Sequence, residues 1–415
     1  MLAACSKNDL EDEDLLWSYY SGFTYPPTLF DSLGALAESS DTRGFLEGLR
    51  CFEKYSQFEN LECYDSALRF FQDIRRTSPE SYLGNLGMGL LYTESAMAGD
   101  TLAANGFAQA AAHYDSAMKK APRHAAVYYY AARNLYNSDK SSFHRRVISL
   151  LDTATQIHPG FAKALERQAE YLSHYLDLEA GGKVDSVRFY FPNIEIQIKH
   201  YFSESLKYDS SWFQTYAGIA RSYRVYSTRE RIDFLKKGLA IARAQKSPEF
   251  RRLAKSLADI YFFELADYET TINAEKSTSD AEGSYADERE NYHNLAWAHF
   301  YTNDLDRAEA YFKRNTEQAA GGGCRDAWLD KSEFHLLKFQ YESALQAADQ
   351  AISCEPQNPY RAMILKARVY FETGGGEKAR AILLQAKSLA EKEYAGSLDG
   401  FQEYEKIVSF IEALK

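Results

Sequence analysis

Apolar residues recur along this chain at the three- and four-residue spacing of amphipathic helices, in segments that end at prolines. A small residue stands twelve positions before four of these prolines, and another apolar segment follows each one. The pairs are Ala67 and Pro79, Ala110 and Pro122, Val147 and Pro159, and Ala344 and Pro356. Self-similarity at a period of roughly 34 to 45 residues is typical of helical repeats. The pattern therefore predicts an array of helix pairs.

The clearest repeats lie near the C-terminus. Positions are counted here from the first residue named in each unit. One unit has Trp328, Ala344, Ala351 and Pro356 at positions 0, 16, 23 and 28. The unit before it has Tyr292, Leu295, Ala296, Ala308 and Phe312 at 0, 3, 4, 16 and 20, and the unit after it has Met363, Ala367, Tyr370, Ala379 and Ala386 at 0, 4, 7, 16 and 23. These spacings resemble the tetratricopeptide repeat (TPR). Small residues let two helices cross closely, and the proline ends the second helix.

This resemblance implies an all-α fold, a right-handed superhelical solenoid of TPR-like helix hairpins. We expect about nine hairpins between Arg43 and Lys392. Residues 29–282 are interpreted as degenerate repeats with insertions, 289–392 as well-formed repeats, and 397–415 as a capping helix. The largest insertion, Asp177 to Asn193, carries the β-like run Val187 to Phe191.

The first residues suggest a lipid anchor. Leu2-Ala3-Ala4-Cys5 resembles a bacterial lipobox, so residues 1–4 are interpreted as a signal-peptide remnant and Cys5 as the lipidated residue. Residues 5–28, rich in carboxylates, are interpreted as a solvated tether. A complete signal needs an apolar core of roughly 7–15 residues, and only four residues precede Cys5. The expected location is the cell envelope, at the outer membrane; the alternative is a cytoplasmic protein with a fortuitous cysteine.

Charge and motifs exclude several function classes. The chain has 48 basic and 59 acidic residues, a net charge of −11, which argues against a general nucleic-acid binder. No run approaches 18 apolar residues, so no transmembrane helix is expected. Nucleotide-loop, zinc-protease, hydrolase and EF-hand motifs are absent from the sequence. We therefore expect no catalytic residues, no cofactor and no metal.

Three smaller features have structural explanations. His293 and His299 are six residues apart, on nearly opposite faces of one helix, and cannot hold a metal together. Glu166 and Glu170 share a helix face and are expected to be solvated. The glycines between Gly84 and Gly89 are interpreted as helix-packing residues.

Two cysteine pairs need separate treatment. Cys324 precedes a first helix and Cys354 ends its partner, so both lie at the same end of one hairpin. An exported protein could join them in a disulfide, which requires the two Cα atoms to lie within about 7 Å. Of the two alternatives, we expect two independent thiols. Cys51 and Cys63 lie at unequal distances from their turn and are not expected to meet.

The expected functional surface is the concave face of the array. In TPR proteins, residues at i, i+4 and i+7 or i+8 of the first helices project into this groove. Here they are His293, Trp297 and Tyr301; Leu329, Glu333 and Leu337; and Ile364, Arg368 and Phe371. Aromatic residues beside mixed charge suit a peptide or helix laid in the groove. The alternative is that Trp297 packs on the neighbouring repeat.

These features favour a non-catalytic, lipid-anchored TPR scaffold that binds protein or peptide partners and no nucleic acid. A second hypothesis is a lipoprotein that handles a small solute as an accessory to a transporter. That function needs an apolar pocket, which the aromatic insertion at 177–193 could cover. A third is an accessory to an enzyme, with catalysis in a partner. The sequence does not identify the partner.

Overall fold

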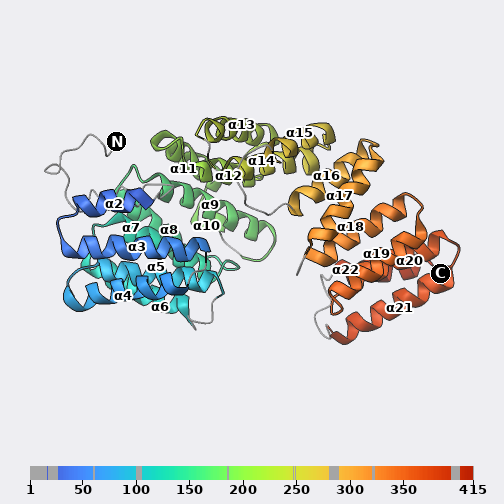
Figure 1. The fold of residues 1–415 in the computed structure, drawn as a ribbon, viewed down its shortest axis with the longest axis horizontal. Coiled ribbons are helices and arrows are strands. Elements are labelled where there is room, and N and C mark those ends of the chain that lie inside the picture. The colour runs from blue at the N-terminus through green and yellow to red at the C-terminus, as the bar shows by residue number, and fades with distance from the viewer. Residues whose placement is uncertain are drawn as a thin grey trace. The chain divides into compact units, whose positions relative to one another are not determined.

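The computed structural model describes residue 16 and residues 27–58, 61–99, 105–184, 187–245, 247, 249–279, 289–319, 323–393 and 402–414. These residues divide into two compact units, unit 1 spanning 1–249 and unit 2 spanning 250–415. Every regular element in the described ranges is a helix, coloured along the chain in Figure 1. The predicted all-α fold is therefore confirmed. No helix in these ranges is long and apolar enough to cross a membrane.

Unit 1 consists of helix hairpins, each packed on the next, with α2 (Pro27–Leu36) packed on the first. The pairs are α3 (Ser40–Phe58) with α4 (Leu61–Thr77), α5 (Leu83–Met97) with α6 (Gly106–Lys120), α7 (Ala125–Ser138) with α8 (Arg145–Ile157), α9 (Ala162–Ala180) with α11 (Ile194–Tyr208), and α12 (Phe213–Arg221) with α13 (Thr228–Ala244). The short helix α10 (Val187–Tyr190) lies between α9 and α11.

Unit 2 continues the pattern. Its pairs are α14 (Glu249–Asp259), extended by the π-helical turn η3 (Ile260–Glu264), with α15 (Tyr268–Ser279); α16 (Arg289–Tyr301) with α17 (Leu305–Gln318); α18 (Gly323–Leu337) with α19 (Tyr341–Cys354); and α20 (Tyr360–Glu372) with α21 (Gly376–Glu393). The last helix, α22 (Gln402–Ala413), packs on α20 and α21 through the buried Ile407 and Ile411. The hairpins of the two units, counted over the described residues, match the expected nine.

The prolines and small residues act as the repeat pattern predicts. Helices α4, α6, α8 and α19 each end two residues before a proline, because proline has no N–H to donate and clashes with the preceding turn. The small residue twelve positions earlier is fully buried in all four helices. Glycines serve the same packing: a Cβ added at Gly87 would overlap the ring of Phe71, so α5 approaches α4 closely there.

The β-like run in the insertion does not form a strand. Val187 to Tyr190 is the short helix α10, with Val187 buried and Phe189 exposed. The ring of Phe143 packs against Tyr190 and Phe191, at 5.9 Å and 6.0 Å between ring centroids. A strand needs a neighbouring strand to satisfy its N–H and C=O groups, and the described residues offer none here.

The crossing of α18 and α19 can be tested by overpacking. Ala344 is fully buried, and its carbonyl accepts a hydrogen bond from Ser332 Oγ at 2.8 Å. Ala344→Leu adds volume that this crossing cannot hold, so we expect a loss of about 1–3 kcal/mol in the free energy of unfolding. Chemical denaturation measures the loss, and hydrogen exchange should locate it in α16–α21, because repeats couple to their neighbours.

Ala381→Leu is the matched control, since Ala381 is exposed on α21 and the same added volume meets solvent there. It should leave stability within about 0.5 kcal/mol of the parent. Equal losses for the two variants, or loosening by Ala344→Leu that spreads evenly through unit 2, would contradict the repeat-by-repeat packing.

Candidate functional site

The first helices of successive hairpins in unit 2 lie side by side. His293 Nδ1 on α16 lies 2.6 Å from Asp330 Oδ2 on α18, and the rings of Phe300 and Phe334 lie 5.9 Å apart across the same pair. Helix α18 in turn contacts α20. The residues predicted for the groove therefore come from neighbouring helices of one unit.

Burial separates two of these residues from the rest. The side chains of Trp297 and Leu329 are only 7% and 2% exposed. The indole of Trp297 packs edge-on against Phe312, at 5.0 Å between ring centroids, within a core that also contains Phe334. Leu329 packs with Ala348 and the other small residues of the hairpin contact. These two side chains hold the repeats together and offer a partner little surface.

The other predicted residues are accessible. Tyr301, Leu337 and Phe371 are 53%, 37% and 50% exposed, each at the C-terminal end of its first helix. The Tyr301 ring stacks on Tyr268 and on Trp297, at 4.6 Å and 6.0 Å between centroids, so these two rings hold its position although the residue is half exposed. The side chains of Glu333, Ile364 and Arg368 are partly exposed on the same helices. That they bind a partner remains a prediction.

His293 is held by its neighbour. Burial disfavours the charged imidazolium, but the hydrogen bond and negative charge of Asp330 outweigh it and raise the pKa of His293 above its usual value. The ring is also 6.5 Å from Phe262, measured between centroids. His293 therefore joins α16 to α18 through a charge-assisted contact.

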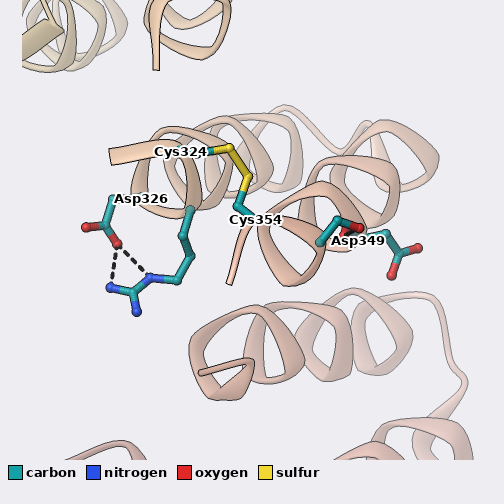
Figure 2. The surroundings of a disulfide bond; sticks show 6 residues. Cys324, Asp326, Asp349 and Cys354 are labelled. Carbon is teal, nitrogen blue, oxygen red and sulfur yellow. Dashed lines mark hydrogen bonds and ion pairs between the residues drawn. A yellow bond between two sulfur atoms is a disulfide. The ribbon is translucent and has the colours of Figure 1, made fainter. Parts of the chain in front are cut away.

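The expectation of two independent thiols at Cys324 and Cys354 is wrong. Figure 2 shows the disulfide that joins Cys324, near the start of α18, to Cys354, the last residue of α19. Their Cα atoms lie 5.8 Å apart because the antiparallel pairing of the two helices brings these ends together. Sequence spacing alone placed both cysteines at this end but could not give the distance. Cys51 and Cys63 form no disulfide with each other, as expected.

An ion pair adjoins the disulfide. Arg325 Nη1 lies 2.6 Å from Glu355 Oε2, so the residues that follow each cysteine are also paired. Arg325 also donates to Asp326 on its own helix, as the dashed lines in Figure 2 show. The open end of this hairpin is therefore closed by a covalent bond and a salt bridge.

Unit 1 has a network of mostly half-buried charges that the sequence reasoning missed. Arg133 on α7 lies 3.1 Å from Glu94 on α5, and Arg221 on α12 lies 2.5 Å from Glu170 on α9. Arg167, on α9, pairs with Glu170 and lies 3.4 Å from Glu166. These contacts link first helices from successive hairpins. The signal that could have found them is the recurrence of charged residues at inward positions of α5, α7, α9 and α12.

The expectation that Glu166 and Glu170 are solvated is wrong for Glu166. Its side chain is fully buried, and burial raises its pKa to about 7. Burial acts on Glu170 in the same direction, but the charges of Arg167 and Arg221 outweigh it and lower the Glu170 pKa. The neighbouring Lys163 is 6% exposed and lies over the Trp212 ring at 5.3 Å, and burial lowers its pKa to about 7.

A cavity of about 640 Å³ lies between α5, α6, α7 and α8. Phe107, Met118, Leu135 and Leu150 contribute to its apolar wall. The ion pair of Arg146 and Asp115, at 3.3 Å, also lines it. No described residue of the insertion at 177–193 contributes to the lining, so the described part of the insertion does not cover this cavity. In the described residues no cluster of metal-ligating side chains is present.

No family model and no curated protein matches this sequence. Solved structures do. IFIT1, as a monomeric mutant with Gppp-AAAA, has a TM-score of 0.51 at 13% identity and covers 97% of this chain and 94% of its own. Yeast Tom70 has a TM-score of 0.46 at 13% identity, covering 97% and 91%. A tetratricopeptide repeat protein from Parabacteroides merdae has a TM-score of 0.42 at 13% identity and covers 66% of this chain and 94% of its own. The pairwise packing of successive helices and the likeness to IFIT1 together give the chain a TPR-like helical-repeat fold.

The disulfide gives a prediction about stability. It closes a loop over a sequence separation of 30, which corresponds to roughly 3–4 kcal/mol of stabilisation in the chain-entropy account. The Cys324→Ser/Cys354→Ser variant should therefore unfold at a lower denaturant concentration than the parent, and dithiothreitol should lower the parent to the same midpoint. Cys51→Ser/Cys63→Ser is the control and should keep the parent's sensitivity to reductant. A parent that is indifferent to dithiothreitol would show that the disulfide is absent.

Glu166 gives a prediction about pH. Its folded pKa of about 7 lies above the ordinary value of 4.5, so between these values the folded state binds a proton that the unfolded state has lost. The stabilisation is complete below pH 4.5 and is lost as the pH rises through 7. Glu166→Gln keeps a neutral side chain, so its stability relative to the parent should rise between pH 5 and pH 8 by up to about 3 kcal/mol.

Denaturation of Glu166→Gln and the parent at both pH values measures this difference. Glu80→Gln, on the exposed surface of unit 1, is the control and should follow the parent at both pH values. If Glu166→Gln also follows the parent, Glu166 is not buried in its neutral form.

Proposed function

We propose that this protein is a non-catalytic TPR-like scaffold of the cell envelope. It binds protein or peptide segments on the inner face of unit 2, which is the face formed by its first helices α16, α18 and α20. The observation that carries this proposal is the exposure of Tyr301, Leu337 and Phe371 at the ends of three neighbouring first helices. Large apolar side chains gathered on an exposed surface mark interaction sites. The partly exposed Glu333 and Arg368 beside them would select among partners by charge.

The inner faces of the two units differ in a way that supports this choice. In unit 1 the charged residues pair with one another across helices, as Arg133 does with Glu94 and Arg221 with Glu170. In unit 2 the partly exposed Glu333 and Arg368 lie beside the most exposed residues predicted for the face, Tyr301, Leu337 and Phe371, which are apolar or aromatic. Burying these against a partner gains hydrophobic free energy, whereas the charged network of unit 1 would first have to be desolvated or broken.

Two observations support a location in the envelope. Leu2-Ala3-Ala4-Cys5 resembles a lipobox, and Cys5 would be the lipidated residue. Cys5 lies outside the described residues, as does the proposed tether except for residues 16, 27 and 28. The disulfide of Cys324 and Cys354 is of a kind that persists in oxidising compartments. The acyl chains of a bacterial lipoprotein exceed the two signals that stable membrane attachment requires. We propose the outer membrane as the site of attachment.

A second function, the handling of a small solute, is favoured by the cavity in unit 1. Its volume of about 640 Å³ lies within the usual range for small-molecule sites, and its wall is mainly apolar. Native mass spectrometry after gentle purification tests this function. A retained small molecule that is lost in Leu135→Arg, which places a charge in the cavity wall, would support solute binding; an unmodified mass in the parent would count against it.

The anchor is tested by fractionation. Expressed behind a complete lipoprotein signal peptide, the parent should partition into the detergent phase because of its acyl chains, and Cys5→Ser should move to the soluble fraction. Cys51→Ser is the control and should fractionate as the parent does. If Cys5→Ser and the parent fractionate alike, the lipid anchor is wrong, while the interaction function of unit 2 is unaffected.

The binding face is tested by photo-crosslinking in cells. A photoreactive amino acid in place of Tyr301 or Phe371 should give defined protein adducts, and one in place of Leu389, exposed on α21, should not. Tyr301→Ala and Phe371→Ala should each weaken capture by roughly 1–2 kcal/mol, and Arg368→Ala should weaken it less and mainly at low salt. Equal adducts at all three positions would contradict the proposed face.

Trp297→Ala is unsuitable as a binding variant. Its ring is buried against Phe312, so truncation should cost about 3–5 kcal/mol of folding free energy and would lower capture by melting the repeat. The unfolding midpoints of all variants therefore accompany the capture measurements. Tyr301→Ala and Phe371→Ala should keep midpoints close to that of the parent because both side chains are exposed.

A further inference from the structure

The insertion between α9 and α11 presents apolar side chains to solvent. Phe189 and Tyr190 on α10 are 81% and 45% exposed, and Ile196 in the first turn of α11 is 69% exposed. The rings of Phe189 and Tyr190 meet edge to face, at 5.3 Å between centroids. Arg188 Nη1 lies 2.7 Å from Glu195 Oε1, so the residues that precede Phe189 and Ile196 are in contact. We call Phe189, Tyr190 and Ile196 the apolar tip.

The apolar tip is held in place by its surroundings. Val187 and Ile194, which precede and follow the exposed rings, are fully buried. Glu179 on α9 accepts a hydrogen bond of 3.1 Å from a backbone N–H of α10. Phe143, in the turn between α7 and α8, packs on the Tyr190 ring. The exposed side chains are therefore presented by a fixed backbone, which lowers the entropy that binding would cost.

Three cationic side chains surround the apolar tip. The guanidinium of Arg145 lies over the Tyr190 ring, 5.3 Å from its centroid. Lys183 lies in the connection between α9 and α10, and Lys140 lies in the turn that carries Phe143. All three cations are exposed, and none has a carboxylate at ion-pair distance among the residues that the structure describes.

The two lysines act on the same neighbour. Burial lowers the pKa of His174 on α9; the charges of Asp177 and Glu170 oppose this effect, and those of Lys140 and Lys183 add to it. Both ammonium groups therefore lie within electrostatic range of one imidazole, although they come from different connections of the chain.

The described carboxylates at this edge are engaged by neighbours. Glu179 and Glu195 both pair with Arg188, at 3.3 Å and 2.7 Å. Asp139 accepts a hydrogen bond from Ser141 Oγ at 2.6 Å. The charges left for a ligand here are positive, on a chain whose net charge is −11. The surface therefore fits a partner that offers anionic groups beside an apolar medium.

Area and shape distinguish a lipid surface from a macromolecular partner. A stable protein interface buries about 800 Å² on each partner, whereas three side chains of this size expose roughly a few hundred Å². A bilayer needs no complementary shape, and its attraction grows with the apolar area inserted and with the cations beside anionic lipid. The edge-to-face rings also form no parallel platform on which nucleic-acid bases can stack.

We propose that the apolar tip inserts into the interface of a bilayer that contains anionic phospholipid, with Arg145, Lys140 and Lys183 against the lipid phosphates. The contact orients unit 1 relative to the membrane. The choice of a bilayer as the occupant rests on the proposed attachment to a membrane, and an acyl chain at Cys5 would strengthen the contact by raising the local concentration of lipid. The contact itself needs no acyl chain.

Sedimentation with vesicles tests the contact on the full chain with Cys5→Ser, which carries no acyl group. This protein should bind vesicles of phosphatidylcholine mixed with phosphatidylglycerol, and bind vesicles of phosphatidylcholine alone less tightly. Phe189→Glu/Ile196→Glu should weaken binding at least about tenfold. Leu61→Glu/Phe339→Glu is the matched control, since these side chains are 56% and 72% exposed elsewhere on the molecule, and it should bind as the parent does.

The cations are tested by charge reversal. Arg145→Glu/Lys183→Glu should weaken binding to the phosphatidylglycerol vesicles at least about fivefold. Lys119→Glu/Arg123→Glu makes the same change of charge at exposed positions before the start of α7, whereas Lys140 follows its end. This control should bind as the parent does. All of these substitutions are at exposed positions, so the unfolding midpoints should stay close to that of the parent.

Photo-crosslinking identifies what the apolar tip touches. In Cys51→Ser/Cys63→Ser, the full chain is coupled through Cys5 to a maleimide lipid in the same vesicles. A photoreactive amino acid in place of Phe189 or Ile196 should give lipid adducts, and one in place of Leu61 or Phe339 should not. Adducts to a second copy of the chain would make the tip a self-association surface and overturn the inference.

The remaining outcomes separate this inference from the proposed anchor. No binding of the Cys5→Ser chain to phosphatidylglycerol vesicles, or equal binding by the tip and control variants, rejects the membrane contact. Fractionation of Cys5→Ser in cells tests the anchor by itself. Vesicle binding that depends on Phe189 would stand if the anchor failed. An anchored chain that gives no lipid adducts at position 189 would keep the anchor and reject the inference.

Discussion

The close crossing of paired helices at small, buried side chains is the contact on which the rest of this structure depends. Ala67, Ala110, Val147 and Ala344 are fully buried where the second helix of a hairpin meets the first. The space beside them is filled by large rings such as Phe71, Tyr114 and Phe312, which are also buried. A larger side chain at the crossing would separate the helices, and the next hairpin would then lose the surface on which it packs.

The two units use their inner faces differently. In unit 1, ion pairs connect successive first helices. The charges of Arg167 and Arg221 offset the desolvation of Glu170, whereas the desolvation of Glu166 is not offset and raises its pKa. Such pairs favour one alignment of the helices more than they add to stability. In unit 2 the corresponding ends of the helices expose Tyr301, Leu337 and Phe371. Exposed apolar side chains that belong to no hydrophobic core can be buried by a binding partner.

Helix periodicity gave part of the candidate site and failed for the rest. The spacing of His293, Trp297 and Tyr301 places them on one side of α16, but Trp297 on this side is buried whereas Tyr301 is exposed. Trp297 is buried because α17 and α18 place Phe312 and Phe334 in the same apolar cluster. Tyr301, one turn later, extends past the end of that contact. The periodicity of one helix cannot show where its neighbours end, so exposure could not be predicted from it.

The sequence by itself determined the helical repeat, because proline stops a helix and a small residue permits a crossing through local chemistry alone. It also determined which end of the α18–α19 hairpin carries Cys324 and Cys354. Only the tertiary structure decided that they meet, with Cα atoms 5.8 Å apart, and that Glu166 lies buried beside Arg167. Distance and burial depend on residues far away in the chain.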